Sequence, residues 1–389
     1  MGLSLQERNV IDWLASQDAA MQALLERLVN IDSGTYNKIG VDSAGDVICR
    51  FLDEHGIGFD VIPNDKFGKA VRAAVGSGEH TILLMGHRDT VFPDGEAQRR
   101  PFRTDGARGY GPGVADMKSG LVMNSFVAAA LKKFGGAPAS IVVLYTADEE
   151  IGSPSSRTLI EAEARRAQAV LVAEPGRPSG VIVTGRKGGI FMRLEVTGKA
   201  AHAGANFEQG VSAIGEMAHK IVALHALTDV PKGITVNVGV VSGGQTVNTV
   251  APSACAEIDL RYITPGDRDA VMAKIKTIIA HAHVPGASAK LEIYGEFLPL
   301  VQTPNSKRLF ELYTECGRML GLTVIGEFTG GCSDAGFSAN VGAPTICAVG
   351  PIGGRVHSPD EYVDLNSIVP RAQVLALTIM RCGASLPGP

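Results

Sequence analysis

Alternation of strand-like and helix-like segments constrains the fold of this 389-residue chain more than any other feature. Continuous runs rich in β-branched residues, such as 140–146 and 169–173, are typical of strands that are buried on both faces. Between such runs lie segments whose apolar residues recur at three- and four-residue steps, such as 10–29, 42–55 and 117–133. Strands that alternate with helices predict an α/β domain with a mixed, largely parallel sheet.

The pattern changes in the middle of the chain. There the predicted order is strand, helix, strand, strand, helix and strand, over residues 190–197, 210–227, 234–241, 253–263, 267–281 and 289–294. This order is that of a ferredoxin-like α+β unit. Alternation of strands and helices then resumes after Pro299. We therefore predict one α/β domain formed by residues 1–185 and 298–389, interrupted by an inserted domain over residues 186–297.

The charge balance excludes some classes of partner. The chain has 36 Lys and Arg against 40 Asp and Glu, a net charge of -4, whereas nucleic-acid binding needs a surplus of clustered cations. No apolar run approaches the roughly 18 residues of a membrane-spanning helix, and Glu7 and Arg8 interrupt the region where a signal peptide is apolar. The six cysteines are scattered, which is typical of reduced thiols. We expect a cytoplasmic protein with neither nucleic-acid nor membrane partners.

Five short segments carry side chains that are suited to metal chemistry. They contain His87 and Asp89 after a strand-like run, Asp116 in a glycine-rich turn, Asp148-Glu149-Glu150 after a second strand, Glu174 after a third, and His357 in a late loop. In open α/β sheets, ligands bind at the carboxyl ends of the strands. Each segment also has a structural alternative, such as a hydrogen-bonded strand-end histidine, a helix N-cap or a solvated acidic turn. Together, the nitrogen and oxygen donors suit zinc, or two zinc ions that share one carboxylate.

These motifs resemble those of the M20 metallopeptidases in their order and spacing. The matching segments are His87-x-Asp89, Ala115-Asp116-x-Lys118, Asp148-Glu149-Glu150-x-Gly152, Glu174-Pro175, residues 198–204 with His202, residues 330–335 and His357-Ser358. The resemblance covers essentially the whole chain and is strongest to the bacterial glutamate carboxypeptidases of this family. It implies a split zinc-peptidase catalytic domain and an inserted lid domain through which the protein forms a homodimer.

The resemblance also implies a set of metal ligands. Asp116 would bridge two Zn²⁺ ions, with Co²⁺ or Mn²⁺ as possible substitutes. His87 and Glu174 would complete one metal site, and Glu150 and His357 would complete the other. The peptide bond between Asp116 and Met117 is expected to be cis.

The resemblance also implies catalytic roles for three further residues. Glu149 would be the general base, which takes a proton from a metal-bridging water and passes it to the leaving amine. Asp89 would hold the imidazole of His87. His202 would reach across the dimer from the partner subunit and stabilise the oxyanion.

Substrate recognition is assigned to the inserted domain and the loop that follows it. Asn248 and Arg261 match positions that hold the substrate carboxylate in relatives, and Arg186 and Gly331 are further candidates. The structural alternative for Arg261 is an ion pair within the sheet. Phe328 stands where the glutamate carboxypeptidases have an arginine, so hydrophobic or aromatic acyl amino acids are as consistent with the chain as glutamate conjugates.

The expected reaction is hydrolysis of the amide bond of N-acyl or peptidyl amino acids. An N-acyl amino acid deacylase that acts on small acyl groups is the alternative within the same chemistry. Two other classes are a hydrolase that uses Cys332 as its nucleophile and a non-catalytic relative that only binds peptides. The second is disfavoured because the chain keeps Glu149 and every expected zinc ligand.

Overall fold

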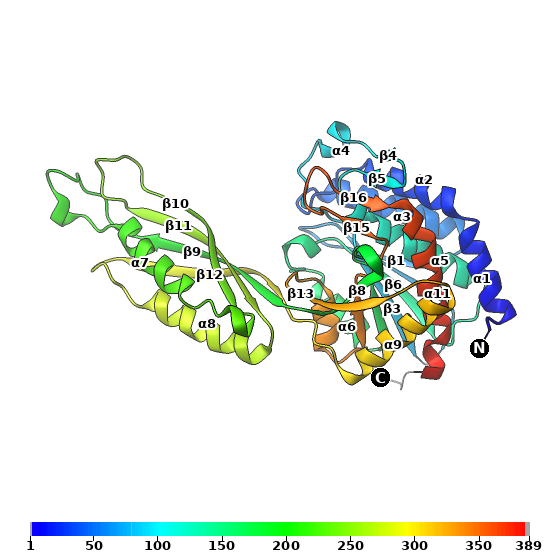
Figure 1. Ribbon diagram of the computed structural model, residues 1–389. Coiled ribbons are helices and arrows are strands. Elements are labelled where there is room, and N and C mark those ends of the chain that lie inside the picture. Colours follow the sequence, from blue (N-terminus) through cyan, green and yellow to red (C-terminus); the bar gives the residue numbers. More distant parts are fainter. Residues whose placement is uncertain (1, 79, 386–389) are drawn as a thin grey trace. The chain divides into compact units, whose positions relative to one another are not determined.

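The chain folds into two compact units. The computed structural model describes residues 2–78 and 80–385, without the side chains of residues 384 and 385. The first unit consists of residues up to 185, residues 300–329 and those from 333 onward, and the second consists of residues 186–299 and 330–332. Figure 1 shows the elements of each unit, most of them labelled.

An eight-stranded sheet forms the centre of the first unit, in the order β1-β2-β6-β3-β7-β14-β8-β13. Strand β3 lies between β6 and β7 and is parallel to both, and β14 is parallel to β7. Strands β1, β2 and β8 pair antiparallel with their neighbours, which confirms the predicted mixed, largely parallel sheet. The strands are β1 (Phe59–Ile62), β2 (Ala70–Val75), β3 (Thr81–His87), β6 (Ser140–Thr146), β7 (Ala167–Val172), β8 (Val181–Arg186), β13 (Ile325–Thr329) and β14 (Thr345–Cys347).

Helices cover this sheet on both faces. Ile82 and Leu84 belong to one apolar cluster with the helices α1, α2, α3, α5, α9 and α11, whereas the alternate residues Leu83 and Met85 are buried outside that cluster. The helices α6 and α10 contact β7. The bounds are α1 (Leu5–Ala15), α2 (Asp18–Val29), α3 (Lys38–Glu54), α4 (Glu96–Arg99), α5 (Ser119–Phe134), α6 (Arg157–Ala164), α9 (Pro304–Met319), α10 (Ala335–Asn340) and α11 (Ile368–Ser385).

The second unit has the predicted ferredoxin-like order. Its elements are β9 (Gly188–Thr197), α7 (Ala213–His225), β10 (Thr235–Gly243), β11 (Ser253–Tyr262), α8 (Pro265–Ala280) and β12 (Ser288–Phe297), and its antiparallel sheet has the order β10-β11-β9-β12. Alternate residues of β9 and β11 form an apolar cluster with α7 and α8, as expected for strands with one covered face. Figure 1 shows both helices on the same side of this sheet.

Some elements differ from the sequence predictions. Helix α3 begins at Lys38 rather than at 42, because the Asn37 side chain caps it by accepting a hydrogen bond from the Gly40 amide at 2.9 Å. A third sheet, in the order β15-β16-β5-β4, was not predicted. Its strands have only two or three residues and therefore show no periodicity; they are β4 (Arg103–Asp105), β5 (Arg108–Tyr110), β15 (Gly353–Gly354) and β16 (Tyr362–Asp364).

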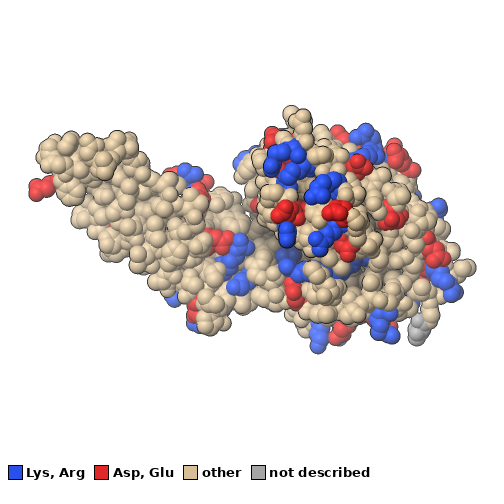
Figure 2. Space-filling model, turned by 45° about the horizontal axis from the view of Figure 1, so that its top comes forward, with Lys and Arg blue, Asp and Glu red and all other residues tan. Residues whose placement is uncertain are grey.

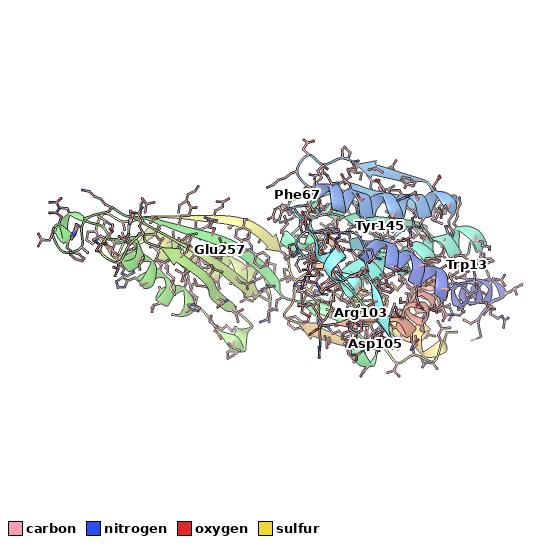
Figure 3. All side chains as sticks on the ribbon, turned by 90° about the horizontal axis from the view of Figure 1, so that it is seen from above. Trp13, Phe67, Arg103, Asp105, Tyr145 and Glu257 are labelled. Carbon is pink, nitrogen blue, oxygen red and sulfur yellow. The ribbon has the colours of Figure 1, made fainter. Side chains whose placement is uncertain are left out.

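Trp13 packs helix α1 against the rest of the first unit. Its ring centroid lies 6.2 Å from that of Phe126 in α5 and 6.4 Å from that of His55. Figure 3 labels Trp13 on helix α1. On the face of this unit seen in Figure 2, Lys and Arg are interspersed with Asp and Glu, so this face lacks the large cationic surface of a nucleic-acid-binding protein. Among the described residues, no helix combines the length and the apolar character that crossing a membrane requires.

An ion pair joins the first and last helices of the chain. Glu7 accepts hydrogen bonds from Arg381 Nε at 2.6 Å and Nη2 at 3.1 Å, and it also accepts one from the backbone amide of Ser4 at 2.7 Å. The Arg381 hydrogen bond lowers the pKa of Glu7, against the effect of burial. A carboxyl whose pKa is lower in the folded state stabilises the fold above its unfolded pKa, and this contribution is lost as the pH falls through the folded-state pKa.

We therefore expect Glu7→Gln to destabilise the protein by about 1–2 kcal/mol at pH 7, between the range for exposed ion pairs and that for hydrogen bonds to charged groups. The difference from the wild type should shrink as the pH falls below the unfolded pKa of about 4.3. Urea unfolding across this pH range measures it. The matched control is Glu311→Gln, whose exposed ion pair with Lys307 spans 4.0 Å and whose loss should be nearly neutral. A destabilisation by Glu7→Gln that is independent of pH would contradict the prediction.

Candidate metal centre

Three parallel strands deliver candidate metal-binding side chains to one edge of the large sheet. His87 is the last residue of β3, Glu149 and Glu150 follow β6, and Glu174 follows β7. Because β3 pairs in parallel with both β6 and β7, the carboxyl ends of all three strands lie at the same edge. The predicted gathering of a histidine and several carboxylates at strand ends follows directly from this topology.

The small third sheet brings two further candidate ligands, Asp116 and His357, to the same place. Strand β5 leads into the glycine-rich turn before Asp116, and β15 and β16 flank the loop that carries His357. Strand β16 pairs with β5, with Tyr362 opposite Tyr110, so the turn and the loop are joined directly. The peptide bond between Asp116 and Met117 is cis, as predicted.

Two groups of three side chains share Asp116. In the first, His87 Nε2 lies 3.2 Å from Asp116 Oδ1 and 3.5 Å from Glu174 Oε1. In the second, His357 Nε2 lies 3.4 Å from Asp116 Oδ2 and 3.3 Å from Glu150 Oε2. In each group the three donor atoms lie within 4.8 Å of one another. Two ligands at about 2 Å from a tetrahedral zinc ion are separated by about 3.3 Å, so both groups have the spacing of metal ligands.

The charges at this centre favour cations. Burial raises the pKa of Glu150 to about 7, and Glu150 Oε1 is buried without a hydrogen-bond partner. Hydrogen bonds to Asp116 and Glu150 raise the pKa of His357 to about 10. Burial also raises the pKa of Asp116, but His357 and His87 outweigh it and leave that pKa lowered. Crowded carboxylates with an unpaired buried oxygen are stabilised by divalent cations, so the residues present fit a two-metal centre.

Glu149 lies beside both groups but belongs to neither. Its Oε2 is 3.9 Å from His87 Nε2, and its side chain is almost fully buried. Burial raises the pKa of Glu149 well above its usual range, and the nearby carboxylates of Glu174 and Asp334 act in the same direction. A buried carboxylate beside a metal pair, which is not itself a ligand, has the position of a general base.

Asp89 holds the backbone of Glu149 and Glu150 as well as the imidazole of His87. The backbone amides of Glu149 and Glu150 donate to its two carboxylate oxygens at 3.2 and 3.1 Å, and the Thr35 hydroxyl donates to Oδ2 at 2.8 Å. His87 Nδ1 is 3.0 Å from the backbone carbonyl of Asp89 and 3.4 Å from its carboxylate. If Nδ1 is the protonated nitrogen, Nε2 keeps its lone pair for a metal ion.

The predicted residues of the second unit form two groups at opposite ends of its sheet. His202 and Asn248 lie near the end where Thr197 pairs with Ser253, and the backbone amide of Ala203 donates to the Asn248 carbonyl at 2.9 Å. Arg186 and Arg261 lie near the end where Gly188 pairs with Tyr262. These two ends are about 30 Å apart along β9, at about 3.4 Å per residue.

The hydrogen bonds of His202 define its tautomer. Its Nδ1 accepts from the backbone amides of Gly204 and Ala205, both at 3.1 Å. An imidazole whose Nδ1 is an acceptor carries its proton on Nε2. The exposed His202 side chain can therefore present an N–H donor, which is what an oxyanion requires.

The two arginines are bound to their surroundings in the second unit. Arg186 Nη1 donates to the carbonyls of Gly331 and Cys332, both at 3.2 Å. Arg261 forms an ion pair within the sheet, with Nη2 at 2.7 Å from Asp259 Oδ2. This ion pair is the structural alternative that was given for Arg261 from the sequence. Its Nη1 donates to Cys332 Sγ at 2.7 Å. Burial raises the pKa of the Cys332 thiol, which makes it a poor nucleophile and disfavours the cysteine-hydrolase alternative.

Residues 83–381 match the model of the Peptidase family M20/M25/M40. The chain belongs to this family. It is 33% identical over 393 aligned residues to carboxypeptidase G2 of Pseudomonas sp. (strain RS-16), with 97% of this chain and 94% of the relative covered. It is 28% identical over 363 residues to the acetylornithine deacetylase of Pasteurella multocida (strain Pm70), with 86% and 89% covered.

A solved structure confirms the fold. The M20 family metallo-carboxypeptidase Sso-CP2 from Sulfolobus solfataricus superimposes with a TM-score of 0.79 at 18% identity, over 94% of this chain and 99% of that one. The protein is thus a hydrolase of the M20 family, whose members depend on metal ions, and its fold presents a candidate metal site.

Glu361 is a residue of this M20 centre that sequence reasoning missed. It is fully buried, and its Oε1 accepts hydrogen bonds from the backbone amides of Ala115 at 2.8 Å and Asp116 at 2.9 Å. Burial raises the pKa of Glu361 to about 7, against the effect of these donors. Its side chain therefore holds the turn that presents Asp116, the candidate ligand shared by the two groups, and no local pattern around residue 361 signals that contact.

Asp334 is a second residue whose contribution sequence reasoning missed. It lies in the segment 330–335, which resembles the family, but no role was assigned to it from the sequence. The Ser153 hydroxyl donates to its Oδ1 at 2.5 Å, and burial raises the pKa of Asp334 to about 8. Its carboxyl raises the pKa of Glu149. Asp334 therefore contributes to the protonation behaviour of the proposed base.

Proposed function

We propose that this protein is a zinc-dependent amidohydrolase of the carboxypeptidase kind, which hydrolyses the amide bond of N-acyl or peptidyl amino acids and releases the free amino acid. The observation that carries this proposal is the pair of ligand groups that share Asp116, with Glu149 beside them and outside both. The similarity to carboxypeptidase G2 supports the same reaction type.

The residues that would hold the metal ions are those of the two groups. His87, Asp116 and Glu174 would bind one zinc ion, and Asp116, Glu150 and His357 would bind the second. When bound, such a pair supplies Lewis acidity at the scissile carbonyl and lowers the pKa of water at the site. Cobalt or manganese can occupy ligand sets of this kind, because nitrogen and carboxylate donors do not select zinc alone.

Glu149 would move the proton. Its carboxylate takes a proton from the attacking water and delivers it to the nitrogen of the leaving amino acid, so that an amine departs instead of an amide anion. Asp89 orients this base through the backbone amide of Glu149. His202 would donate its Nε2 proton in a hydrogen bond to the oxyanion that develops on the carbonyl.

The free carboxylate of the substrate would bind to Arg261 and, because the two residues of one chain lie at opposite ends of the sheet, to Asn248 of the partner subunit. We propose that it replaces Cys332 Sγ as the acceptor for Arg261 Nη1, because a carboxylate accepts a hydrogen bond far better than a thiol does. Arg186 and Gly331 hold the adjacent loop through the contact between the guanidinium and the Gly331 carbonyl.

The opposite positions of His202 and Arg261 support a homodimer. If both residues act at one active site, a single inserted domain cannot supply them, because they lie at opposite ends of its sheet, about 30 Å apart. In a symmetric dimer, the inserted domain of one subunit can place His202 at the active site of the other. We propose this arrangement, with residues 186–297 as the dimerising lid domain, and a cytoplasmic location, which the six free cysteines support.

A mixture of two inactive variants tests the exchange of His202. We expect His202→Ala to lower kcat by about 10²–10³-fold, as the loss of one oxyanion donor does. Subunit exchange between His202→Ala and Glu149→Gln should restore about a quarter of the wild-type activity, because half of the dimers are mixed and each has one complete site. Activity that stays at the level of the separate variants after exchange would show that His202 acts within its own chain or not at all.

A release assay tests the function itself. The zinc-loaded enzyme is offered a matched panel of benzoyl, acetyl and glutamyl conjugates of glutamate, leucine and ornithine, and a chelated sample serves as the control. The proposal predicts release of the amino acid from conjugates with large acyl groups, and no release after chelation. The similarity to acetylornithine deacetylase favours one alternative, a deacylase, which would act on the acetyl conjugates alone. Failure of every conjugate would refute both.

A further inference from the structure

A cavity of about 380 Å³ lies in the first unit, apart from the two ligand groups of the metal centre. It is bounded by the loop between β7 and β8, by the chain just before β13, and by the first turn of α11. Its apolar wall includes Leu322, Val324 and Val374, and its polar wall includes Asp364 and Arg371. The volume is sufficient for a small organic molecule.

Arg371 is the unusual residue of this cavity. Only 4% of it is exposed, and no described acidic residue pairs with it within 4.0 Å. Its Nη1 is buried without a partner in hydrogen-bond geometry, and its Nη2 has a long contact of 3.5 Å to the Val181 carbonyl. Burial raises the pKa of Tyr313, and the charge of the Arg371 guanidinium and a hydrogen bond from it act in the opposite direction, so this polar neighbour of the guanidinium is an uncharged hydroxyl. A buried cation without a counter-ion is costly, and an anion that enters the cavity would remove that cost.

The walls indicate what kind of anion fits. A guanidinium binds a planar carboxylate through two parallel N–H donors, and it is more selective for this geometry than an ammonium is. The aliphatic side chains beside it would cover an apolar body, whereas a small inorganic anion would leave them in contact with water. We propose that this cavity is a second binding site of the enzyme, for a small organic carboxylate whose apolar part packs on Leu322, Val324 and Val374.

The site borders the segments that carry two metal ligands. Gly176 follows Glu174 by two residues and faces the guanidinium so closely that a Cβ atom on it would lie 2.9 Å from Arg371 Nη2. The Gly176 amide donates to the Pro351 carbonyl at 2.8 Å, and Ile352, which lines the cavity, leads towards the loop of His357. A bound carboxylate would therefore contact the support of the metal centre without touching either ligand group.

Such a carboxylate could belong to a free amino acid or to an acid without an amino group, and two probes distinguish these sources. 4-Fluorobenzoate represents carboxylic acids without an amino group, and leucine represents free amino acids, whose ammonium group Asp364 could bind. Binding of each probe to the zinc-loaded protein is measured by titration calorimetry, and that of fluorobenzoate also by ¹⁹F NMR. Tighter binding of leucine that is lost in Asp364→Asn would assign the site to amino acids, and tighter binding of fluorobenzoate would assign it to acids without that group.

Two variants decide whether the cavity is the site. Arg371→Met should weaken the binding of the preferred probe by about tenfold or more, as expected for a lost charged hydrogen bond. Thr323→Trp fills the cavity from its exposed rim and leaves Arg371 in place, so it should have the same effect even if Arg371→Met fails to fold. The matched control Arg318→Met, an exposed cation on α9, should bind as the wild type does. Unchanged probe binding in Thr323→Trp would overturn the proposal. Binding of the probe at a single site, from which a competitive inhibitor of the hydrolysis reaction displaces it, would also overturn the proposal.

Discussion

Glu149→Gln is expected to lower kcat by about 10³–10⁴-fold while the protein keeps both metal ions, since this is the upper range for loss of a general base. The side chain keeps its shape but can no longer accept a proton from water. Neither ligand group includes Glu149, so the metal content should not change. Because ground-state binding of the substrate does not involve this carboxylate, KM should change little.

The comparison that sharpens this prediction is Glu150→Gln. Glu150 is the neighbouring residue and is also buried, but its Oε2 lies 3.3 Å from His357 Nε2 within the second ligand group. This variant should lose affinity for one metal ion, and excess zinc should restore part of its activity. Metal analysis after dialysis, together with kcat measured at several zinc concentrations, separates the two residues. If Glu149→Gln lost metal, or if zinc rescued it, Glu149 would be a ligand and the assigned base would be wrong.

The positions of the candidate ligands at strand ends could be predicted because each follows a run that is visible in the sequence. A buried strand such as β3 is a continuous apolar segment, and His87 stands where that segment ends. Parallel pairing then places the residues after β6 and β7 at the same edge, although the three segments are far apart in the chain. The ferredoxin-like order of the second unit was predicted for the same reason, since its strands and helices are long enough to show their periodicity.

Contacts that depend on short strands or on remote pairing could not be predicted. The strands β15 and β16 have two and three residues, yet with β5 they join the turn of Asp116 to the loop of His357. Glu361 holds the Asp116 amide from 245 residues away in the chain, and nothing near either residue marks that hydrogen bond. Such contacts follow from the tertiary fold, and a single sequence contains no local signal for them.

The burial of two charged residues of helix α7 could not be predicted from the sequence either. Their ion pair gives the largest effect on stability that we expect. Lys220 and Glu216 are each only 1% exposed, with Nζ 2.8 Å from Glu216 Oε1. Lys220 Nζ also donates to the carbonyls of Ile278 and Ile279 at 3.0 Å and of His281 at 2.9 Å, which end helix α8. An i,i+4 pair of this composition is usually a solvated surface pair, so only its burial shows its importance.

Lys220→Met should destabilise the inserted unit by about 3–5 kcal/mol, the range for breaking a buried ion pair from one side. The variant leaves the Glu216 carboxylate buried without its cation, although the amides of His283 and Val284 still donate to Oε2 at 2.8 and 2.7 Å. It also leaves three carbonyls of the α8 terminus without their donor. Burial raises the pKa of Glu216, but Lys220 and these amides outweigh it in the wild type and leave that pKa lowered, so the loss of Lys220 removes a main cause that keeps the buried carboxylate charged.

Native-state hydrogen exchange is the appropriate measurement, because the two units of the chain need not unfold together. Amides of β9 and β11 should lose protection in Lys220→Met, whereas those of β3 and β6 in the first unit should not. The double variant Glu216→Gln/Lys220→Met should recover part of the loss, since no uncompensated charge remains buried. Lys232→Met is the matched control, because its ion pair with Asp229 is exposed and contributes at most about 1 kcal/mol. A Lys220→Met protein as protected as this control would mean that water or a rearranged loop solvates Glu216, and that the pair does not hold α7 to α8.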